Sequence, residues 1–249
     1  MKDETLARVV PYVIIHANAE APRECCGVVI LKDADLVYVG CRNIAVEHEH
    51  FLIAGYDYAR AEDSGQVMAI AHSHPYISPE PSLADRIGIE RTKLPWLIVN
   101  IPVGSYTITR PSRFKAPLIG RPFVHGVHDC YAIVRDYFAE RFGISLHDYP
   151  RAFGWWDDPF GPDLYRENFA KEGFVEVDRE SMQAGDLLLM NIRARRDNHM
   201  AVYLGGGVIL HHLIGQVSRR EAYQEFYQRR TTAVLRHKSM IQGGSHADR

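Results

Sequence analysis

The spacing of apolar residues near the start of the chain predicts a helix followed by a β-hairpin. Between residues 5 and 19, apolar side chains recur about every 3.6 positions, at Leu6, Val9, Val10, Val13, Ile14 and Ala17. Pro11 weakens the first half of this predicted helix, because proline lacks the N–H that an interior helical position donates. The β-branched runs 27–31 and 36–40 flank Lys32-Asp33-Ala34-Asp35, so we expect the two runs to pair as a hairpin.

The following stretch predicts helices alternating with strands. We expect helices at 54–63 and 82–91, and strands at 67–71, 96–101 and 105–109. The side chain of Ser82 is suited to cap the second of these helices, which places Asp85 in its first turn. The last two strands are expected to pair around Pro102-Val103-Gly104.

The character of the sequence changes at residues 110–117, which are basic, contain proline and show no periodicity. This segment is the best candidate for a linker. Beyond it we expect helices at 129–141 and 164–171, strands at 187–190, 200–204, 208–211 and 231–235, and a loose polar tail at 243–249. The whole pattern predicts an α+β protein of two domains, at residues 1–113 and 118–249.

The composition is that of a folded protein with substantial cores. Of the 249 residues, 46% are apolar and 24% are charged. The formal net charge is −2 and the pI is about 6.7, so no overall field attracts nucleic acid or anionic lipid, and we expect no nucleic-acid partner. No run approaches the roughly 20 apolar residues of a membrane span, and the polar start is unlike a signal peptide. We therefore expect synthesis in a cytoplasm without export by the ordinary secretory route.

The four cysteines do not form a pattern typical of disulfide scaffolds or thiolate zinc sites. Cys25 and Cys26 are adjacent, and no CxxC pair is present. Cys25, Cys26 and Cys41 are expected to be small core residues.

A first candidate site is the run from His72 to Asp85, which has the pattern H-x-H, seven residues, S-x-x-D. Side chains at i and i+2 of a strand point the same way, so His72 and His74 can bind the same metal ion. Asp85 can return to the same point if a loop leads into its helix. Two nitrogens and one oxygen with an open fourth position are the donor set of catalytic zinc.

The alternative is that His72 and His74 are solvent-side strand residues before a proline-rich loop. His48 and His50 form a second H-x-H without a later serine and aspartate, and we expect a charged surface loop there.

The first pattern resembles the JAMM, or MPN-plus, metallopeptidase motif, which predicts a mixed-sheet zinc domain. The resemblance implies Zn2+ on His72, His74 and Asp85, with Glu24 before an apolar strand as the general base and Ser82 as a donor to the oxyanion. It also implies a peptide or isopeptide bond as the substrate.

A second candidate site centres on Cys130, at the first turn of the helix predicted at 129–141. Free N–H groups and the helix dipole at that position favour thiolate over thiol, although most free cysteines are buried small hydrophobes. His199 begins a predicted strand, and His211 follows twelve residues later on the next one, across Gly205-Gly206-Gly207. In such a hairpin His199 can activate Cys130 while His211 orients the imidazole. His212, on the opposite face, is the reserve.

These residues resemble the NlpC-type cysteine peptidases, papain-like enzymes that cut peptide bonds in bacterial cell walls. The matching runs are Asp129-Cys130, Ala184-Gly185-Asp186-Leu187 and His199-Met200-Ala201-Val202-Tyr203-Leu204-Gly205. The resemblance implies a catalytic trio of Cys130, His199 and His211. Two departures are Tyr131-Ala132 in place of a small pair after the cysteine, and Phe123 where a tyrosine hydroxyl is common. The backbone N–H of Cys130 remains as an oxyanion donor, and its companion is unassigned.

A JAMM-like domain followed by an NlpC-like domain resembles the protein K family of tail-tip assembly proteins in lambdoid phages. The resemblance implies a virion protein of the tail tip that is made in the host cytoplasm and acts in the periplasm or cell wall. Its implied partners are other tail-tip proteins and bacterial peptidoglycan, and its implied activities are needed for tail assembly and DNA entry. The alternative is a structural assembly scaffold with vestigial hydrolase sites. A bacterial wall-remodelling or deubiquitinating enzyme is a third hypothesis, weakened by the lack of a signal peptide and wall-binding repeats.

Overall fold

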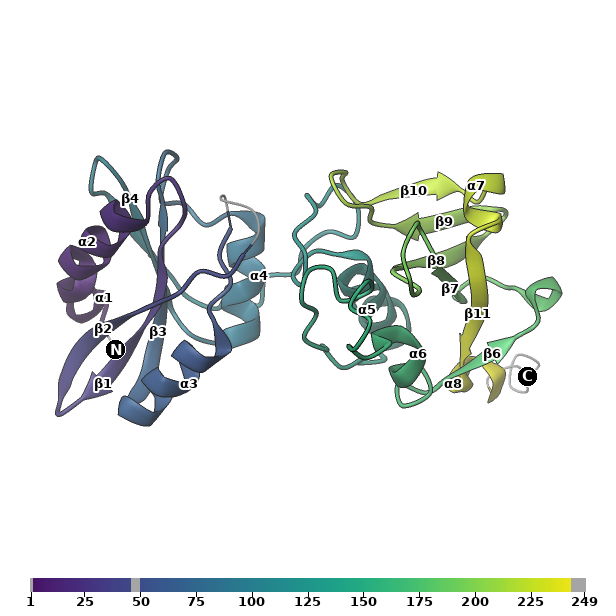
Figure 1. The fold of residues 1–249 in the computed structure, drawn as a ribbon, viewed down its shortest axis with the longest axis horizontal. Helices are drawn as coiled ribbons and strands as arrows, with labels where there is room; N and C mark the ends of the chain where they lie inside the picture. Colours follow the sequence, from purple (N-terminus) through teal and green to yellow (C-terminus); the bar gives the residue numbers. More distant parts are fainter. Residues whose placement is uncertain (1, 46–49, 243–249) are drawn as a thin grey trace. The chain divides into compact units, whose positions relative to one another are not determined.

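The computed structural model describes residues 2–45 and 50–242, and the chain divides into two compact units at 1–115 and 116–249 (Figure 1). The division lies inside the segment 110–117 that we expected to be a linker. The expectations for His48 and for the tail at 243–249 fall outside the described residues. No helix within the described ranges has the length and apolar character needed to cross a bilayer.

Unit 1 is built on a five-stranded sheet in the order β2-β1-β3-β4-β5, in which only β3 and β4 are parallel. Its strands are β1 (Cys26–Lys32), β2 (Asp35–Cys41), β3 (Gln66–His74), β4 (Trp96–Asn100) and β5 (Tyr106–Thr109). Its helices are α1 (Asp3–Leu6), the 3-10 turn η1 (Ala7–Val9), α2 (Val10–Glu20), α3 (Gly55–Ser64) and α4 (Leu83–Thr92).

The predicted elements of unit 1 are confirmed, with one change at the first helix. Pro11 lies in the first turn of α2, after η1, so its missing N–H interrupts no helical hydrogen bond. The predicted hairpin pairs β1 with β2 up to Lys32↔Asp35. Asp33 and Ala34 both have left-handed φ, 48° and 71°, as a two-residue hairpin turn requires.

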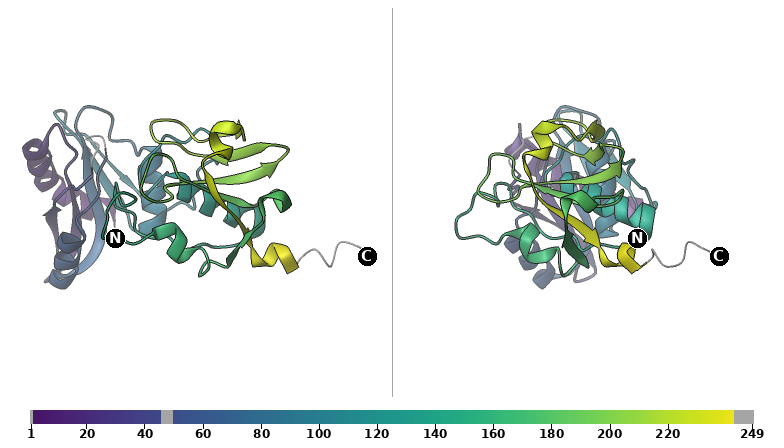
Figure 2. Two further views of the ribbon diagram at one scale, coloured as in Figure 1. Left: turned by 45° about the vertical axis from the view of Figure 1, so that its right-hand side comes forward. Right: turned by 90° about the vertical axis from the view of Figure 1, so that its right-hand side faces the viewer.

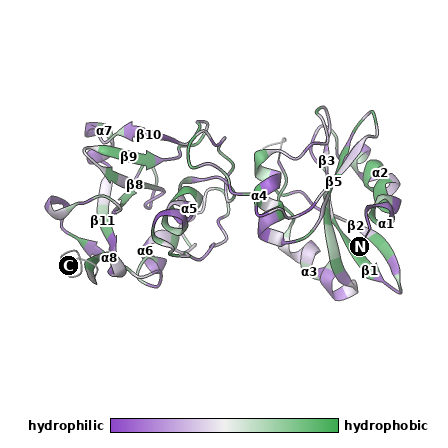
Figure 3. Ribbon diagram, turned by 180° about the vertical axis from the view of Figure 1, so that it is seen from behind, coloured by the Kyte–Doolittle hydropathy of each residue, from purple (hydrophilic) through white to green (hydrophobic). Residues whose placement is uncertain are grey.

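Helices cover both faces of this sheet (Figure 2). The apolar run of β1, visible in the hydropathy colouring of Figure 3, contributes alternate residues to two cores. Val29 packs with the residues of α1 and α2, whereas Val28 and Ile30 pack with α3 and α4. The parallel step from β3 to β4 passes through α4, which brings the start of α4 beside the end of β3.

Unit 2 is built on a six-stranded antiparallel sheet in the order β10-β9-β8-β7-β11-β6. Its strands are β6 (Phe174–Val177), β7 (Leu187–Met190), β8 (His199–Gly205), β9 (Val208–His211), β10 (Arg219–Ala222) and β11 (Thr231–His237). Its helices are α5 (Cys130–Phe142), α6 (Leu164–Asn168), the 3-10 turn η2 (Arg179–Ser181), α7 (Glu225–Gln228) and α8 (Lys238–Gln242).

The predicted helices and strands of unit 2 are confirmed. The short helices α7 and α8 were not predicted, and neither were the strands β6 and β10. Both strands are four residues long, and the sequence of β10, Arg-Arg-Glu-Ala, carries no apolar alternation. One face of the sheet packs on α5 through Ile133, Val134 and Phe138. This contact holds the start of α5 against β8, the strand that begins with His199.

The contact between Gly88 of α4 and the ring of Trp96 predicts that this helix tolerates no extra methyl group. A Cβ at position 88 would lie 2.3 Å from a ring carbon of Trp96, which is itself buried. We expect Gly88→Ala to lower the free energy of unfolding by about 1–3 kcal/mol, because overpacking outweighs the gain in helix propensity.

Gly55→Ala is the matched control, since a Cβ at this first residue of α3 meets nothing within 4 Å. Urea unfolding followed by circular dichroism measures both variants. Equal stability of Gly88→Ala and Gly55→Ala would contradict the tight packing.

Candidate active sites

The residues of the first motif converge at the carboxyl end of β3. The Nε2 atoms of His72 and His74 lie 3.2 Å apart. The Asp85 carboxylate lies 3.3 Å from each of them, through Oδ1 to His72 and through Oδ2 to His74. All three side chains are buried. The loop and helix cap therefore return Asp85 to the two histidines, as the spacing predicts.

Glu24 joins this group from the residue pair before β1. Its Oε1 lies 3.9 Å from His74 Nε2, and donor atoms of Glu24, His72 and His74 all lie within 4.8 Å of one another. The N–H of Cys25 donates to Ser73 Oγ at 2.9 Å, and the N–H of Ser73 donates to the Cys25 carbonyl at 3.2 Å. These two bonds fix the position of Glu24 beside β3.

Neighbouring groups orient the two imidazoles. His74 Nδ1 lies 2.7 Å from the Ser78 carbonyl, so Nδ1 carries the hydrogen and Nε2 has a free lone pair. The ring of His72 stacks on Phe51 at 4.5 Å between centroids and meets the edge of Trp96 at 5.5 Å. Burial lowers the pKa of His72, which keeps this imidazole neutral and able to bind a metal.

Ser82 caps α4 as predicted, in a reciprocal arrangement with Asp85. The N–H of Asp85 donates to Ser82 Oγ at 3.1 Å, and the N–H of Ser82 donates to Asp85 Oδ2 at 2.7 Å. Burial opposes ionisation of Asp85, but the two histidines outweigh it and hold the pKa of Asp85 far below its usual range. The capping serine thus holds a carboxylate in place.

The donor set fits a zinc ion. Ligands at about 2.0–2.1 Å from zinc in a tetrahedral arrangement lie about 3.3 Å from one another. The Nε2 atoms of His72 and His74 lie 3.2 Å apart, and each lies 3.3 Å from an oxygen of Asp85, Oδ1 for His72 and Oδ2 for His74. Imidazole nitrogens and a carboxylate are also ligands that zinc binds.

The second site begins at the first residue of α5. Asp129 caps this helix, because its side chain accepts from the N–H of Ala132 at 2.8 Å. Cys130 follows, with its Sγ 3.4 Å from the Tyr165 hydroxyl and 4.0 Å from the Asn198 carbonyl. Asn198 directly precedes His199, so the sulfur lies at the start of β8.

The two histidines of the second motif lie side by side on β8 and β9. His199 Nε2 is 3.2 Å from His211 Nδ1, as the predicted hairpin requires. His211 Nε2 in turn lies 2.9 Å from the carboxylate of Glu221 on β10. His212 lies outside this row, with its Nε2 3.1 Å from the Gln216 carbonyl and its ring against Phe123.

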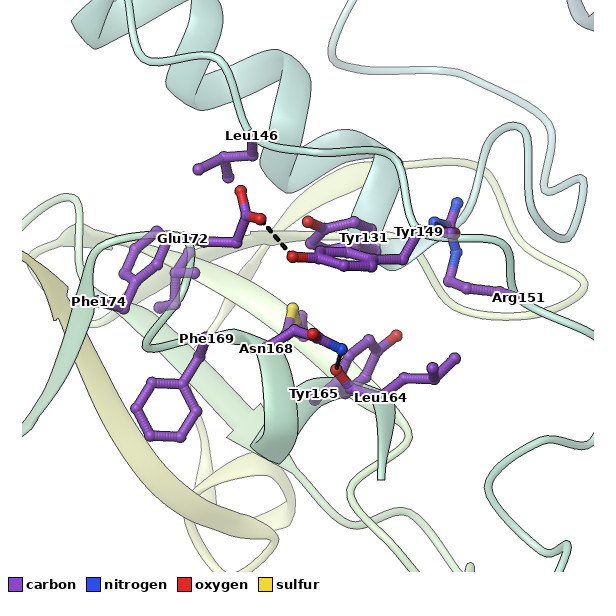
Figure 4. A pocket seen from close by; sticks show the side chains of 12 residues that line it. Tyr131, Leu146, Tyr149, Arg151, Leu164, Tyr165, Asn168, Phe169, Glu172 and Phe174 are labelled. Atoms are coloured by element: carbon purple, nitrogen blue, oxygen red, sulfur yellow. Dashed lines mark hydrogen bonds between the residues drawn. The ribbon is translucent and has the colours of Figure 1, made fainter. Parts of the chain in front are cut away.

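Cys130 and His199 open onto one pocket of about 280 Å3. Its lining is rich in aromatic rings, which belong to Phe123, His125, Trp155, Trp156, Tyr165 and His212. A second cavity, shown in Figure 4 beside Tyr131, Tyr149 and Tyr165, holds only about 20 Å3, room for roughly one water molecule. The larger pocket is therefore the candidate substrate site.

Burial changes the protonation expected from the helix terminus. It raises the pKa of Cys130 to about 11, with Asp129 adding to the effect, so Cys130 is a thiol in this structure and not the thiolate expected at a helix start. Burial lowers the pKa of His199 to about 3, helped by His211 and His212. The resting pair is a thiol and a neutral imidazole.

Three residues of this site were missed in the sequence: Arg151, Tyr165 and Glu221. Arg151 donates to Asp129 Oδ2 through Nε at 2.8 Å and to Oδ1 through Nη2 at 3.3 Å, and both side chains are buried. Arg151 and Glu221 lie in segments without apolar periodicity, whereas Tyr165 lies in the predicted helix 164–171, and no local pattern indicates the partners of any of the three. Phe123 lines the pocket without a hydroxyl, whereas the hydroxyl of Tyr165 reaches the sulfur.

The chain is similar to known proteins in both units and over nearly its full length. The family model for prokaryotic homologs of the JAB domain matches residues 7–112, and that for the NlpC/P60 family matches residues 120–236. A "Tail tip assembly protein K" from Escherichia phage N15 is 41% identical over 234 residues, which cover 94% of this chain and 96% of that protein. The protein of that name from Escherichia phage lambda is 37% identical over 183 residues, 74% of this chain and 88% of that protein.

The chain belongs to the tail tip assembly protein K family. Membership in the protein K family confirms the resemblance and the fold class predicted from the motifs, a JAB/MPN-like domain followed by an NlpC/P60 domain. The NlpC/P60 match points to a cysteine hydrolase in unit 2. Among solved structures, the NlpC/p60 domain of the peptidoglycan hydrolase SagA is 21% identical over 48% of this chain and 89% of that one, with a TM-score of 0.34, a distant likeness.

The buried ion pair between Asp129 and Arg151 predicts a large cost for removing the arginine. We expect Arg151→Ala to lower the free energy of unfolding by about 3–5 kcal/mol, because it leaves a buried carboxylate without its partner. Arg135→Ala, which removes a partly exposed pair with Asp148, is the control and is expected to cost about 0–1 kcal/mol. Denaturant unfolding measures both, and similar costs would contradict this account.

The ion pair between Asp129 and Arg151 also makes the free energy of unfolding depend on pH. Burial opposes ionisation of Asp129, but Arg151 outweighs it, so the pKa of Asp129 is lowered. The contribution of Asp129 to the free energy of unfolding is complete above the ordinary aspartate pKa of about 4. It is lost as the pH falls through the lower pKa that Asp129 has in the folded protein. Unfolding below pH 4 tests whether Arg151→Ala removes this acid-sensitive part.

Proposed function

We propose that unit 2 hydrolyses peptide bonds in the stem peptides of bacterial peptidoglycan, with Cys130 as the nucleophile. The observation that carries this proposal is that Cys130 and His199 line one pocket while His211 holds the far nitrogen of His199. The NlpC/P60 match supports the reaction class. The aromatic side chains of the pocket offer apolar contacts to the methyl groups and methylene chains of such a peptide.

In this mechanism, substrate binding brings an amide carbonyl to the sulfur and the proton of Cys130 passes to His199. The thiolate attacks the carbonyl, and the N–H of Cys130 together with the Tyr165 hydroxyl donates to the oxyanion. His199 then protonates the leaving amine. Water, with His199 as base, hydrolyses the acyl-enzyme and restores the thiol. A proton transfer coupled to attack fits a resting pair of thiol and neutral imidazole.

We further propose that the protein acts at the tail tip of a phage virion. Its relatives in phages N15 and lambda are named for tail tip assembly, which suggests other tail-tip proteins as partners. In this role the protein is made in the host cytoplasm and carried by the virion to the periplasm and cell wall, where wall hydrolysis assists DNA entry. A purely structural scaffold is less favoured, because it has no use for a thiol and two histidines arranged around a pocket.

Unit 1 is proposed as a second, zinc-dependent peptidase or isopeptidase centre. His72, His74 and Asp85 would hold the zinc ion, which supplies Lewis acidity that lowers the pKa of water and polarises a carbonyl. Glu24, whose Oε1 lies 3.9 Å from His74 Nε2, would accept a proton from water. The Ser82 hydroxyl uses its oxygen to accept from Asp85, which leaves its hydrogen to donate to an oxyanion.

Digestion of purified peptidoglycan tests the nucleophile. We expect Cys130→Ala to abolish release of stem-peptide fragments, read by mass spectrometry, because no other group in the pocket forms the acyl-enzyme. Cys41→Ala, which removes a buried thiol of unit 1, is the control and should digest like the wild type. Retained digestion by Cys130→Ala would overturn the assignment.

Metal analysis tests the zinc centre separately. We expect about one zinc per chain after dialysis against trace zinc, and a loss of at least about tenfold in zinc affinity for His74→Ala, because one of three ligands is removed. His50→Ala, from the second H-x-H, is the matched control and should keep its zinc. Equal zinc content in both variants would sink the proposed ligand set, and wall digestion by His74→Ala should remain.

A further inference from the structure

Glu221 lies at the end of the row of hydrogen-bonding groups that begins at His199. It is on β10, whose Arg219 pairs directly with His211 on β9, so Glu221 is the diagonal neighbour of His211 on the same face. One oxygen, Oε2, lies 2.9 Å from His211 Nε2. The same oxygen accepts from Arg219 through Nε at 3.0 Å and Nη2 at 2.8 Å, and from the Tyr227 hydroxyl at 2.9 Å.

These donors keep Glu221 in the carboxylate form. Burial opposes its ionisation, but the hydrogen bonds from Arg219, Tyr227 and His211 outweigh it and lower the pKa of Glu221. A carboxylate can only accept hydrogen bonds, so the hydrogen between Glu221 and His211 must belong to His211 Nε2. His211 is buried and its pKa is lowered by that burial, so the imidazole carries this single hydrogen.

The position of that hydrogen decides the next one along the row. With its hydrogen on Nε2, His211 presents a bare lone pair at Nδ1. The contact of 3.2 Å between His211 Nδ1 and His199 Nε2 is then a hydrogen bond only if His199 is the donor. His199 therefore carries its hydrogen on Nε2, and its Nδ1 is the nitrogen left to take a proton from Cys130.

We infer that Glu221 is a positioning residue that sets, through His211, the tautomer of His199 required for hydrolysis at Cys130. This inference rests on the proposed cysteine-hydrolase function of unit 2. Without the carboxylate, His211 can place its hydrogen on Nδ1 and donate it to His199 Nε2. His199 would then hold its hydrogen on Nδ1 and could not act as the base. His211, the third member of the trio, needs a fixed acceptor such as Glu221 because either of its nitrogens can carry the hydrogen.

The test replaces Glu221 and reads the tautomer and the thiol directly. Glu221→Gln keeps the size and an acceptor oxygen but adds an amide that can donate to His211 Nε2. Nitrogen-15 spectra of histidine-labelled protein, with His199 assigned from His199→Ala, are expected to show hydrogen on Nε2 in the wild type. In Glu221→Gln we expect a shift toward hydrogen on Nδ1, and in Glu221→Asp a return toward the wild-type pattern.

The rate at which iodoacetamide alkylates Cys130 reports whether His199 acts as a base, without any wall substrate. The rate is measured by mass spectrometry of the peptide that contains Cys130. We expect the rate to fall at least about tenfold in Glu221→Gln, since a wrong histidine tautomer disables the base. Glu225→Gln, which alters an exposed glutamate of α7, is the control and should react like the wild type. Circular dichroism checks that each variant is folded.

The two outcomes separate this inference from the proposed function. Unchanged His199 spectra and an unchanged alkylation rate in Glu221→Gln would overturn the role of Glu221, whether or not the wild type digests peptidoglycan. A shifted tautomer with a slower thiol would support it, even if the wall proved not to be the substrate. Failure of the wild type to digest any wall preparation would count against the proposed function alone.

Discussion

The free N–H groups at the start of a buried helix must find acceptors, and in both units the residue that meets this need also fixes the candidate site. At α4, Ser82 and Asp85 cap each other, and the carboxylate that takes part in this cap lies 3.3 Å from both histidines of β3. At α5, Asp129 accepts from the N–H of Ala132 and so places Cys130 at the first turn. In each unit, the residues that cap the helix therefore also position the candidate site.

Burial then governs what these groups can do. Asp129 is a charged cap in an apolar surrounding, and it depends on Arg151, which reaches it from a loop twenty-two residues away. The same burial keeps Cys130 protonated and His199 neutral. Burial of a charge is costly, so both groups rest in their uncharged forms.

In both candidate sites, neighbouring residues form hydrogen bonds that orient the histidine side chains. Ser78 holds His74 through its carbonyl, and Asn100 donates to the carbonyls of His74 and Ile77 at 3.2 and 2.5 Å. In unit 2, His211 holds His199, and Glu221 holds His211. In a low dielectric such rows of hydrogen bonds set hydrogen positions as well as orientations.

Local patterns in the sequence were enough to predict the α+β class, most of the strands and helices, and the residues His72, His74, Asp85, Cys130, His199 and His211. The reason is that strand alternation, helix capping and hairpin length act over a few residues, and these six positions follow those rules. Glu24 was placed by resemblance to a family motif, and the structure brings it within 4.8 Å of the histidines.

The tertiary structure alone decided the partners of these residues and their protonation. Glu221 lies in a short polar strand that pairs with β9, and Arg151 comes from a loop with no periodicity to interpret. Tyr165 lies in a helix that was predicted, but nothing local indicates that its hydroxyl reaches Cys130. The thiol form of Cys130 could not be predicted from its place at a helix start, because the cost of burying a charge depends on what the rest of the chain packs around it.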